Sequence, residues 1–249
     1  MKHAICSDIH GRLDSFEVFL RYIAQRDDIS CVIIPGDFFG VPGLETVKAE
    51  DVLKEMDRQY KAIGAQLISF QNSTGKGVML IAGNYDYDFS NSAYLKEWDM
   101  HRKTKKIDNL LFAGFGGHDH KPYKVLEETA MSFDEKEAFY FLESVKPDVV
   151  ISHSRVKEYL RQYSPLLSIN GHTHIFEYFY NESDNENRTI VIKPGSVGSA
   201  FHSEKKVNLA QTFVVIDYSD LTQAELYTLG KDEIKSEKRI VQIRQIKKT

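Results

Sequence analysis

Short apolar runs that end directly in polar residues recur along this chain of 249 residues. Residues 31–34 are followed by Pro-Gly-Asp, and residues 78–82 are followed by Gly-Asn. Between such runs, residues 13–23, 47–63 and 134–145 have the apolar spacing of amphipathic helices. Short strands that alternate with helices predict an α/β fold, with helices packed on a sheet.

The pattern changes after residue 174, where helical spacing becomes rare. Residues 175–180, 189–193, 212–217 and 224–229 have the composition of strands separated by turns. We predict that these strands form an antiparallel or mixed second sheet. The polar stretch 181–188 is predicted to be a solvated hairpin loop.

The composition favours one domain over residues 1–249, because 42% hydrophobic residues can build a substantial core. A net charge of -4 argues against a protein that coats nucleic acid, since such proteins need clustered Lys and Arg. The segment from Lys231 onward is locally basic. It is predicted to be a solvated strand or helix, and the alternative is a basic tail that binds a partner or nucleic acid.

Three features favour the cytoplasm. Cys6 and Cys31 each lie in an apolar, strand-like run, so we expect buried free thiols and no disulfide. The N-terminus lacks the pattern of a signal peptide. No apolar stretch approaches the roughly 20 residues that cross a bilayer, so no membrane association is expected.

Polar side chains able to bind metal ions follow five of the apolar runs. Loops at the carboxyl ends of neighbouring strands converge on one edge of a sheet, so these side chains are expected to meet. Such a group of polar and like-charged side chains is costly to bring together unless cations lie among them. The candidate metal ligands are Asp8, His10, Asp37, Asn84, His153, His172 and His174.

The spacing of these residues supports convergence. Asp8 and His10 are separated by one residue, as are His172 and His174, so in an extended segment each pair leaves on the same face. The set contains oxygen and nitrogen ligands without thiolate. It therefore favours manganese, iron, zinc, cobalt or nickel over calcium or a soft metal.

In this order the residues resemble the motifs of the calcineurin-like metallophosphoesterase superfamily. The superfamily pattern is Asp-x-His, Gly-Asp, Gly-Asn-His-Asp/Glu, His and Gly-His-x-His. Its counterparts here are residues 8–10, 36–37, 83–86, 153 and 171–174. Residues 193–198, Lys-Pro-Gly-Ser-Val-Gly, are similar to the segment that follows the last motif in the small bacterial and archaeal phosphodiesterase branch.

The resemblance implies a two-sheet β-sandwich flanked by helices, in αββα layers, with two divalent metal ions at one edge, manganese first among them. By the superfamily pattern, the first ion is held by Asp8, His10 and His174, the second by Asn84, His153 and His172, and Asp37 bridges them. Such a pair, roughly 3.5–4 Å apart, generates a metal-bound hydroxide that attacks the phosphoryl group. The implied substrate is a small phosphate ester or a nucleotide.

The chain departs from the superfamily pattern at Tyr85, where a His usually follows the Asn. In the superfamily that His assists the leaving group, and an alkoxide that leaves without a proton is a poor leaving group. The substitution favours a phosphodiesterase over a phosphomonoesterase or a nuclease, and a non-catalytic binding module is a further alternative. The predicted catalytic residues are Asp37, Asn84, Tyr85 and Asp86.

Further polar residues near these motifs have two open interpretations each. Asp86 either orients a metal ligand without binding the ion itself, or only forms a turn. Arg12 and Arg155 either clamp a phosphate or lie on the surface.

A polar loop and three aromatic residues also lie near the motifs. His118 and His120 are candidates for the lining of a substrate pocket and are not predicted to bind metal. Phe38, Phe39 and Tyr87 could stack on a base or an aryl group, although packing in the core is the commoner fate of such side chains.

Overall fold

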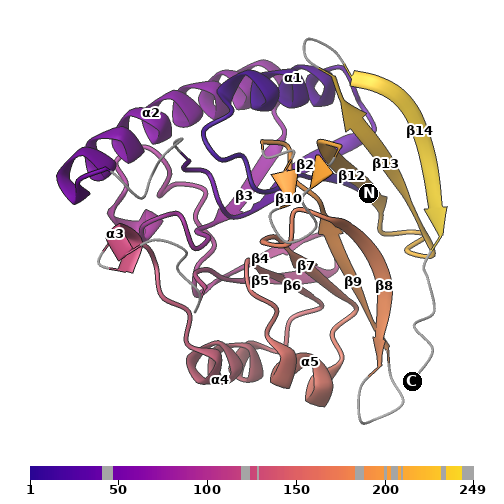
Figure 1. Cartoon of the computed structure of the whole chain (residues 1–249). Helices are drawn as coiled ribbons and strands as arrows, with labels where there is room; N and C mark the ends of the chain where they lie inside the picture. The colour runs from indigo at the N-terminus through magenta and orange to yellow at the C-terminus, as the bar shows by residue number, and fades with distance from the viewer. Residues whose placement is uncertain are drawn as a thin grey trace.

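Two mixed six-stranded sheets lie face to face in the computed structural model of the protein (Figure 1). The structure describes residues 1–40, 47–118, 124–127, 129–182, 188–198, 201–202, 207–208, 210–230 and 234–242. In spatial order, the first sheet contains β14 (Ile234–Gln242), β13 (Gln223–Leu229), β12 (Thr212–Asp217), β1 (Lys2–Ile5), β2 (Ile29–Pro35) and β3 (Gly77–Ile81). The second contains β4 (Lys103–Ile107), β5 (Leu110–Phe115), β6 (Val149–Ser152), β7 (Leu167–Asn170), β9 (Arg188–Pro194) and β8 (Phe176–Glu182).

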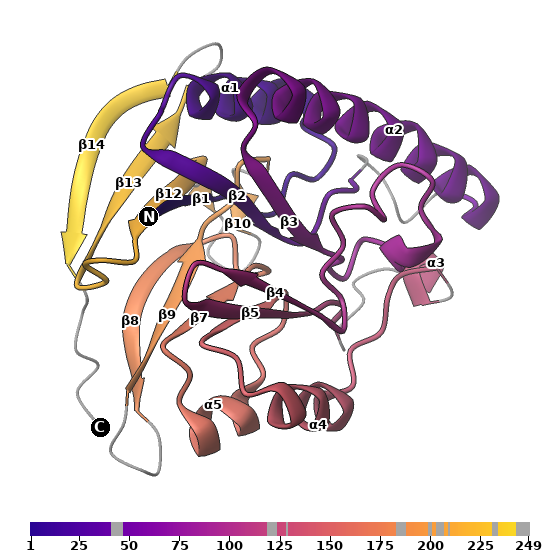
Figure 2. The ribbon, with the colours of Figure 1, turned by 180° about the vertical axis from the view of Figure 1, so that it is seen from behind.

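Helices cover the outer face of each sheet, as the front and back views show (Figure 1, Figure 2). The first sheet is covered by α1 (Leu13–Ala24) and α2 (Ala49–Thr74), and the second by α4 (Glu135–Val145) and α5 (Lys157–Tyr163). The shorter elements are α3 (Lys124–Glu127), the 3-10 helix η2 (Phe89–Asn91) and the pair β10 (Phe201–His202) and β11 (Val207–Asn208). The predicted two-sheet sandwich flanked by helices is confirmed.

The strand β2 shows why the apolar runs are continuous. Val32 and Ile34 are buried against the helices, whereas Cys31 and Ile33 are buried between the sheets. A strand that is covered on both faces is apolar along its whole length. Cys31 and Cys6 are both buried free thiols, as predicted.

Parallel pairing brings the polar strand ends together. In the first sheet β1, β2 and β3 run parallel. In the second sheet β5, β6, β7 and β9 run parallel. The carboxyl ends of each parallel set lie along one edge of its sheet, and loops from both sheets converge there.

The helix predicted at 47–63 begins at Ala49 and continues to Thr74. Its apolar face extends further than predicted, because Leu67 and Phe70 are buried in the same core as the preceding turns. The helix ends at Gly75, which has a φ of 70° and serves as a left-handed cap.

The prediction that the last four strands share one sheet is wrong. The strands β8 and β9 join the second sheet, whereas β12 and β13 extend the first sheet through the antiparallel pairing of β12 with β1. The reason is that β12 is apolar on both faces. Phe213 and Val215 pack towards the helices, and Val214 and Ile216 pack between the sheets.

Several further predictions concern short or polar segments. The antiparallel pair β8 and β9 agrees with the predicted hairpin, whose residues 183–187 lie outside the described part. The basic tail forms the strand β14 up to Gln242, and residues 243–249 lie outside the described part. The strand β4 and the helix α5 were not predicted. The sequence of β4 is Lys-Thr-Lys-Lys-Ile, and an edge strand rich in Lys has no apolar run to reveal it.

Candidate metal centre

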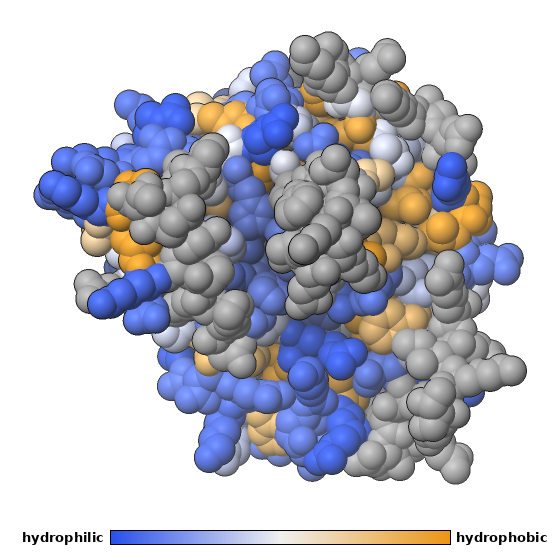
Figure 3. All heavy atoms as spheres, viewed as in Figure 1, coloured by the Kyte–Doolittle hydropathy of each residue, from blue (hydrophilic) through white to orange (hydrophobic). Residues whose placement is uncertain are grey.

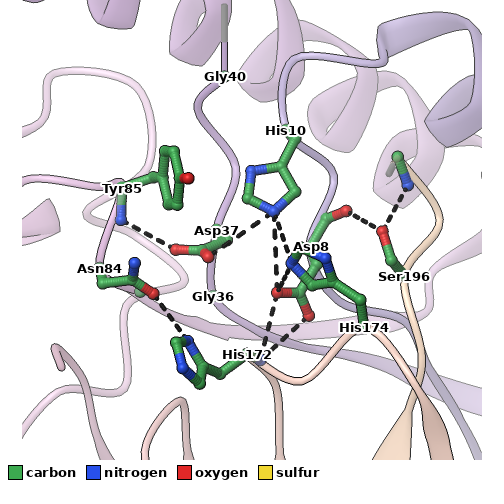
Figure 4. A network of polar contacts seen from close by, with 12 residues as sticks. Asp8, His10, Gly36, Asp37, Gly40, Asn84, Tyr85, His172, His174 and Ser196 are labelled. Atoms are coloured by element: carbon green, nitrogen blue, oxygen red, sulfur yellow. Dashed lines mark hydrogen bonds and ion pairs between the residues drawn. The ribbon is translucent and has the colours of Figure 1, made fainter. Parts of the chain in front are cut away.

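All the predicted metal ligands gather where the carboxyl ends of the parallel strands meet, and Figure 4 labels six of them. On the face shown in Figure 3, hydrophilic side chains gather in the middle of the molecule. The ligands follow β1 (Asp8 and His10), β2 (Asp37), β3 (Asn84), β6 (His153) and β7 (His172 and His174). The structure therefore brings together residues that lie up to 166 positions apart in the sequence, from Asp8 to His174.

The backbone is strained where these residues lie. Positive φ angles, which residues with a Cβ rarely adopt, occur at Asp8 (56°), His10 (47°), Asp37 (58°), His172 (72°) and His174 (56°). Such conformations persist only where the surroundings fix them, and they are concentrated at functional sites. Here the loops after β1 and β2 fix each other, since the backbone N–H groups of Asp8 and His10 donate to the carbonyls of Gly36 and Asp37, each at 3.0 Å.

One cluster of ligand atoms comprises Asp8, His10, Asp37 and His174, all within 4.8 Å of one another. His174 Nε2 lies 3.2 Å from Asp8 Oδ1 and 3.0 Å from His10 Nε2. Asp37 Oδ2 lies 3.8 Å from His10 Nε2. Two imidazoles and two carboxylates thus face a common point.

A second cluster comprises Asp37, His153 and His172, again within 4.8 Å of one another. The Asn84 carboxamide joins it, since its Oδ1 lies 2.9 Å from His153 Nε2 and 3.0 Å from His172 Nδ1. Asp37 Oδ2 lies 3.3 Å from His153 Nε2. Asp37 belongs to both clusters, as Figure 4 shows by its position between Asn84 and His10.

The donor set fits divalent cations. His153 Nδ1 lies 2.7 Å from the carbonyl of Pro35, which can only accept, so Nδ1 donates and, in the neutral ring, Nε2 directs a lone pair towards Asn84 Oδ1 and Asp37. These groups are all acceptors, and a cation between them satisfies them together. The attraction for positive charge also shows in the pKa of His153. Burial lowers it, but Asp37 and Asp8 more than offset this and raise it to about 9.

Both carboxylates stay ionised in this environment. Burial raises the pKa of Asp8, but the neighbouring His174 and His153 lower it further, so the net pKa lies below the usual value. The pKa of Asp37 is lowered in the same way, with His153 as the main opposing cause. His172 is different, because burial together with His153 and His118 lowers its pKa to about 3 and keeps its ring neutral.

Asp86 holds the loops after β2 and β3 together. It is fully buried and accepts hydrogen bonds from the backbone N–H groups of Phe38, Phe39 and Gly83 and from the Tyr60 hydroxyl, at 2.9–3.1 Å. Of the two interpretations, the structure supports an orienting role. Burial and the nearby Asp37 raise the pKa of Asp86 to about 6. Tyr60 was not predicted to take part, because in the sequence it resembles any other apolar position on the inner face of α2.

The loop after β9 supports the first strand end. The Ser196 hydroxyl donates to the Asp8 carbonyl at 2.7 Å (Figure 4). The Gly198 N–H donates to the same carbonyl at 3.1 Å. A Cβ on Gly198 would lie 1.6 Å from the Ile9 carbonyl oxygen, so only glycine allows this approach. The Pro-Gly-Ser segment, residues 194–196, therefore supports the loop that carries Asp8.

Tyr85 lies at the edge of the centre. Its N–H donates to Asp37 Oδ1 at 2.9 Å, and its ring contacts His10 edge to face, with ring centroids 4.8 Å apart (Figure 4). The residue that departs from the superfamily pattern is therefore placed directly beside the predicted ligands.

A cavity of about 460 Å³ opens beside the second cluster. His118 stacks on His172 there, with ring centroids 3.8 Å apart, which agrees with its predicted place in a pocket lining. His120 lies outside the described residues. Residues on the cavity wall are His118, His153, His172, Arg155, Lys157 and Lys193. Of these, Lys157 and Lys193 were not predicted as site residues, because Lys157 begins the helix α5, which was not predicted, and Lys193 lies in the strand β9, outside the ligand motifs.

The other candidates have structural roles. Arg12 pairs with Asp14 at 3.3 Å on the surface. Phe38 and Phe39 are fully buried, so packing is their role and stacking on a substrate is excluded. Tyr87 contacts the Tyr60 ring and donates to Asp57 at 2.8 Å.

The fold and the paired ligand clusters define a class of metal-dependent hydrolases. The sequence profile of the calcineurin-like phosphoesterase family matches residues 1–176. The chain belongs to this family and is a metal-dependent phosphoric ester hydrolase. Comparison with curated protein sequences gives no match.

Solved structures share the fold at low sequence identity. A dimetal phosphatase from Danio rerio has a TM-score of 0.61 at 12% identity, over 98% of this chain and 99% of that chain. A 5'-nucleotidase from Candida albicans SC5314 has a TM-score of 0.54 at 16% identity, over 93% of this chain and 52% of that chain.

In the described part of the chain, no helix has the length and apolar character needed to cross a membrane.

Proposed function

We propose that this protein is a phosphodiesterase with a dinuclear metal centre. The observation that carries the preference for diesters is the position of Tyr85, whose ring lies against His10 where the family pattern has an imidazole. The substrate is a small phosphate diester or a nucleotide derivative. Nucleic acid is disfavoured by the net charge of -4.

In this proposal one ion is held by Asp8, His10 and His174, the other by Asn84, His153 and His172, and both by Asp37. Supporting this assignment, Asp37 Oδ2 lies 3.3 Å from His153 Nε2 and 3.8 Å from His10 Nε2. When bound, the two ions would activate water as a nucleophile and stabilise charge on the phosphoryl group. The nitrogen and oxygen donors favour manganese first, and iron, zinc, nickel or cobalt as alternatives.

The residues of the chain orient this centre. The Nδ1 atoms of His10 and His153 lie 3.3 Å and 2.7 Å from the carbonyls of Phe39 and Pro35, which fixes the ring tautomers and directs both Nε2 atoms inward. Asp86 fixes the backbone next to Asp37 and Asn84. These hydrogen bonds are present in the protein without substrate, so the ligand rings and loops are oriented in advance.

Tyr85 limits which leaving groups depart. A phenol with a reference pKa near 10 is a weaker proton donor at neutral pH than imidazole. The rate should therefore depend steeply on the stability of the departing oxyanion. Activated aryl diesters should be cleaved well, and alkyl monoesters poorly.

The test is kcat/KM for a series of esters with graded leaving-group pKa, measured for the wild type, Tyr85→His and Tyr85→Phe. Tyr85→His should flatten the dependence and accelerate poor leaving groups by about 10²-fold, which is typical of a positioned acid. Tyr85→Phe should change little. A large loss in Tyr85→Phe confined to poor leaving groups would identify Tyr85 as the acid and contradict this account.

The preference for diesters over monoesters is tested by a separate comparison of two substrates. The kcat/KM for bis(p-nitrophenyl) phosphate should exceed that for p-nitrophenyl phosphate under the same metal conditions, because the two substrates share one leaving group. The opposite order would assign the protein to the phosphomonoesterases.

A further inference from the structure

The cavity beside the second ligand cluster is positively charged. Arg155, Lys157 and Lys193 lie on its wall, together with one carboxylate, Glu177. Lys193 Nζ lies 2.5 Å from Glu177, which neutralises that pair. Two cations remain without a matching anion, in a chain whose net charge is -4.

Arg155 is the more informative of these two cations. It is half-buried, follows the ligand His153 by two residues, and has no hydrogen bond or ion pair with any residue that the structure describes. A guanidinium loses part of its hydration on burial and is normally compensated by an anion. Lys157, the first residue of α5, is exposed at the rim and likewise unpaired within the described residues.

Thr173 supplies an independent observation. It lies on the same wall, between the ligands His172 and His174. Its Oγ1 is buried and has no hydrogen-bond partner in the described part of the chain. Buried hydroxyls are almost always paired, and a rotation of this side chain towards the cavity is needed to give its hydroxyl a partner in a bound ligand.

These groups match a phosphate. Two cations and a hydroxyl form three separate donors, and a terminal phosphate offers three oxygens, whereas a carboxylate offers two. The cavity volume of about 460 Å³ also suits a ligand larger than one anion. Because His153 and His172 belong to both the cavity wall and the ligand cluster, a molecule in the cavity would extend to the metal centre.

We propose that this cavity binds a second phosphate of the substrate, so that the preferred substrates are phosphodiesters that carry an additional phosphate. The inference rests on the proposed function for the reacting diester. It adds a specificity site formed by Arg155, Lys157 and Thr173, which bind the substrate and do not touch the reacting phosphorus.

A matched pair of substrates tests the proposal. The p-nitrophenyl ester of thymidine 5'-phosphate and its 3'-phosphorylated derivative differ by one phosphate and share the leaving group. With the manganese-loaded full-length protein, kcat/KM should be higher for the phosphorylated substrate by about tenfold or more, the effect expected of charge-assisted hydrogen bonds. Arg155→Gln and Lys157→Gln should each reduce this ratio towards unity.

Arg161→Gln provides the control. Arg161 also lies on α5, but it is exposed and pairs with Glu158 at 2.6 Å. This variant should keep the wild-type ratio. A wild-type ratio near unity, or an unchanged ratio in both Arg155→Gln and Lys157→Gln, would overturn the proposal.

Binding measurements distinguish the proposed phosphate site from the proposed phosphodiesterase activity. By calorimetry on the metal-loaded protein, thymidine 3',5'-bisphosphate should bind about tenfold more tightly than thymidine 5'-phosphate, and Arg155→Gln should remove the difference. If this preference is found but neither ester is cleaved, the phosphodiesterase fails and the phosphate site stands. If both esters are cleaved and both nucleotides bind equally, the phosphate site fails and the phosphodiesterase stands.

Discussion

Tyr60→Phe removes one hydroxyl from the network that supports the metal centre. This hydroxyl donates to Asp86 at 2.9 Å, and burial together with the Asp86 charge raises its pKa, so it remains a donor. A hydrogen bond to a charged group contributes about 1.5–3 kcal/mol. Three backbone N–H groups still bind the carboxylate, and Phe gains apolar character, so we expect a net loss of about 1–2 kcal/mol. For a chain of this size that corresponds to a Tm lower by about 2–8 °C.

The same substitution should affect catalysis. Asp86 fixes the backbone beside Asp37 and Asn84, and small displacements of catalytic groups are costly. We expect kcat to fall by about three- to tenfold while KM changes less. Tyr159→Phe is the matched control, because Tyr159 is 1% exposed and its hydroxyl makes no hydrogen bond to a described residue. Thermal unfolding and kcat are measured for both variants. Equal Tm values and an unaffected kcat would refute the role assigned to the Tyr60–Asp86 contact.

Three further predictions concern the metal centre and the loop after β9 that supports it. Asp37→Asn should reduce bound metal and abolish turnover while the fold is kept, and normal metal content by elemental analysis would exclude the shared ligand. Chelation should remove activity, and manganese should restore it better than calcium; undiminished turnover in protein shown to be metal-free would rule out metal catalysis. Gly198→Ala places a Cβ 1.6 Å from the Ile9 carbonyl and should cost about 3 kcal/mol, whereas Gly75→Ala, with nothing within 4 Å, should cost about 1 kcal/mol in denaturant unfolding.

The candidate ligands could be predicted to meet because the signal that marks each of them is local. Asp37 follows β2, which contains Cys-Val-Ile-Ile, and His153 comes directly after β6, which contains Val-Val-Ile, and such apolar runs are recognisable without knowing their partner strands. The parallel pairing then places the strand ends together. To predict that these residues meet, it is enough to know which residues follow each strand.

Strand order depends on information that single segments do not carry. The strand β12 lies next to β1, more than 200 residues away, as the pairing of Lys2 with Asp217 shows. Nothing in either segment specifies the other as its neighbour, because many apolar strands could fill the same place. This is why the later strands were assigned to one sheet, although they are divided between two.

The residues that support the metal centre could not be predicted from the sequence, for a related reason. Tyr60 occupies an inner position of α2, where any large apolar residue would satisfy the helical pattern, and its function depends on a hydroxyl that meets Asp86 only in the folded chain. Arg155 and Lys193 likewise become one site only when the loop after β6 and the strand β9 are brought together. Metal ligands are dictated by the chemistry of the ion and recur with fixed spacing, whereas a substrate pocket is assembled from loops that each substrate class shapes differently. Ligand motifs therefore identify the reaction class of such a chain, and its specificity has to be sought in the charges that surround them.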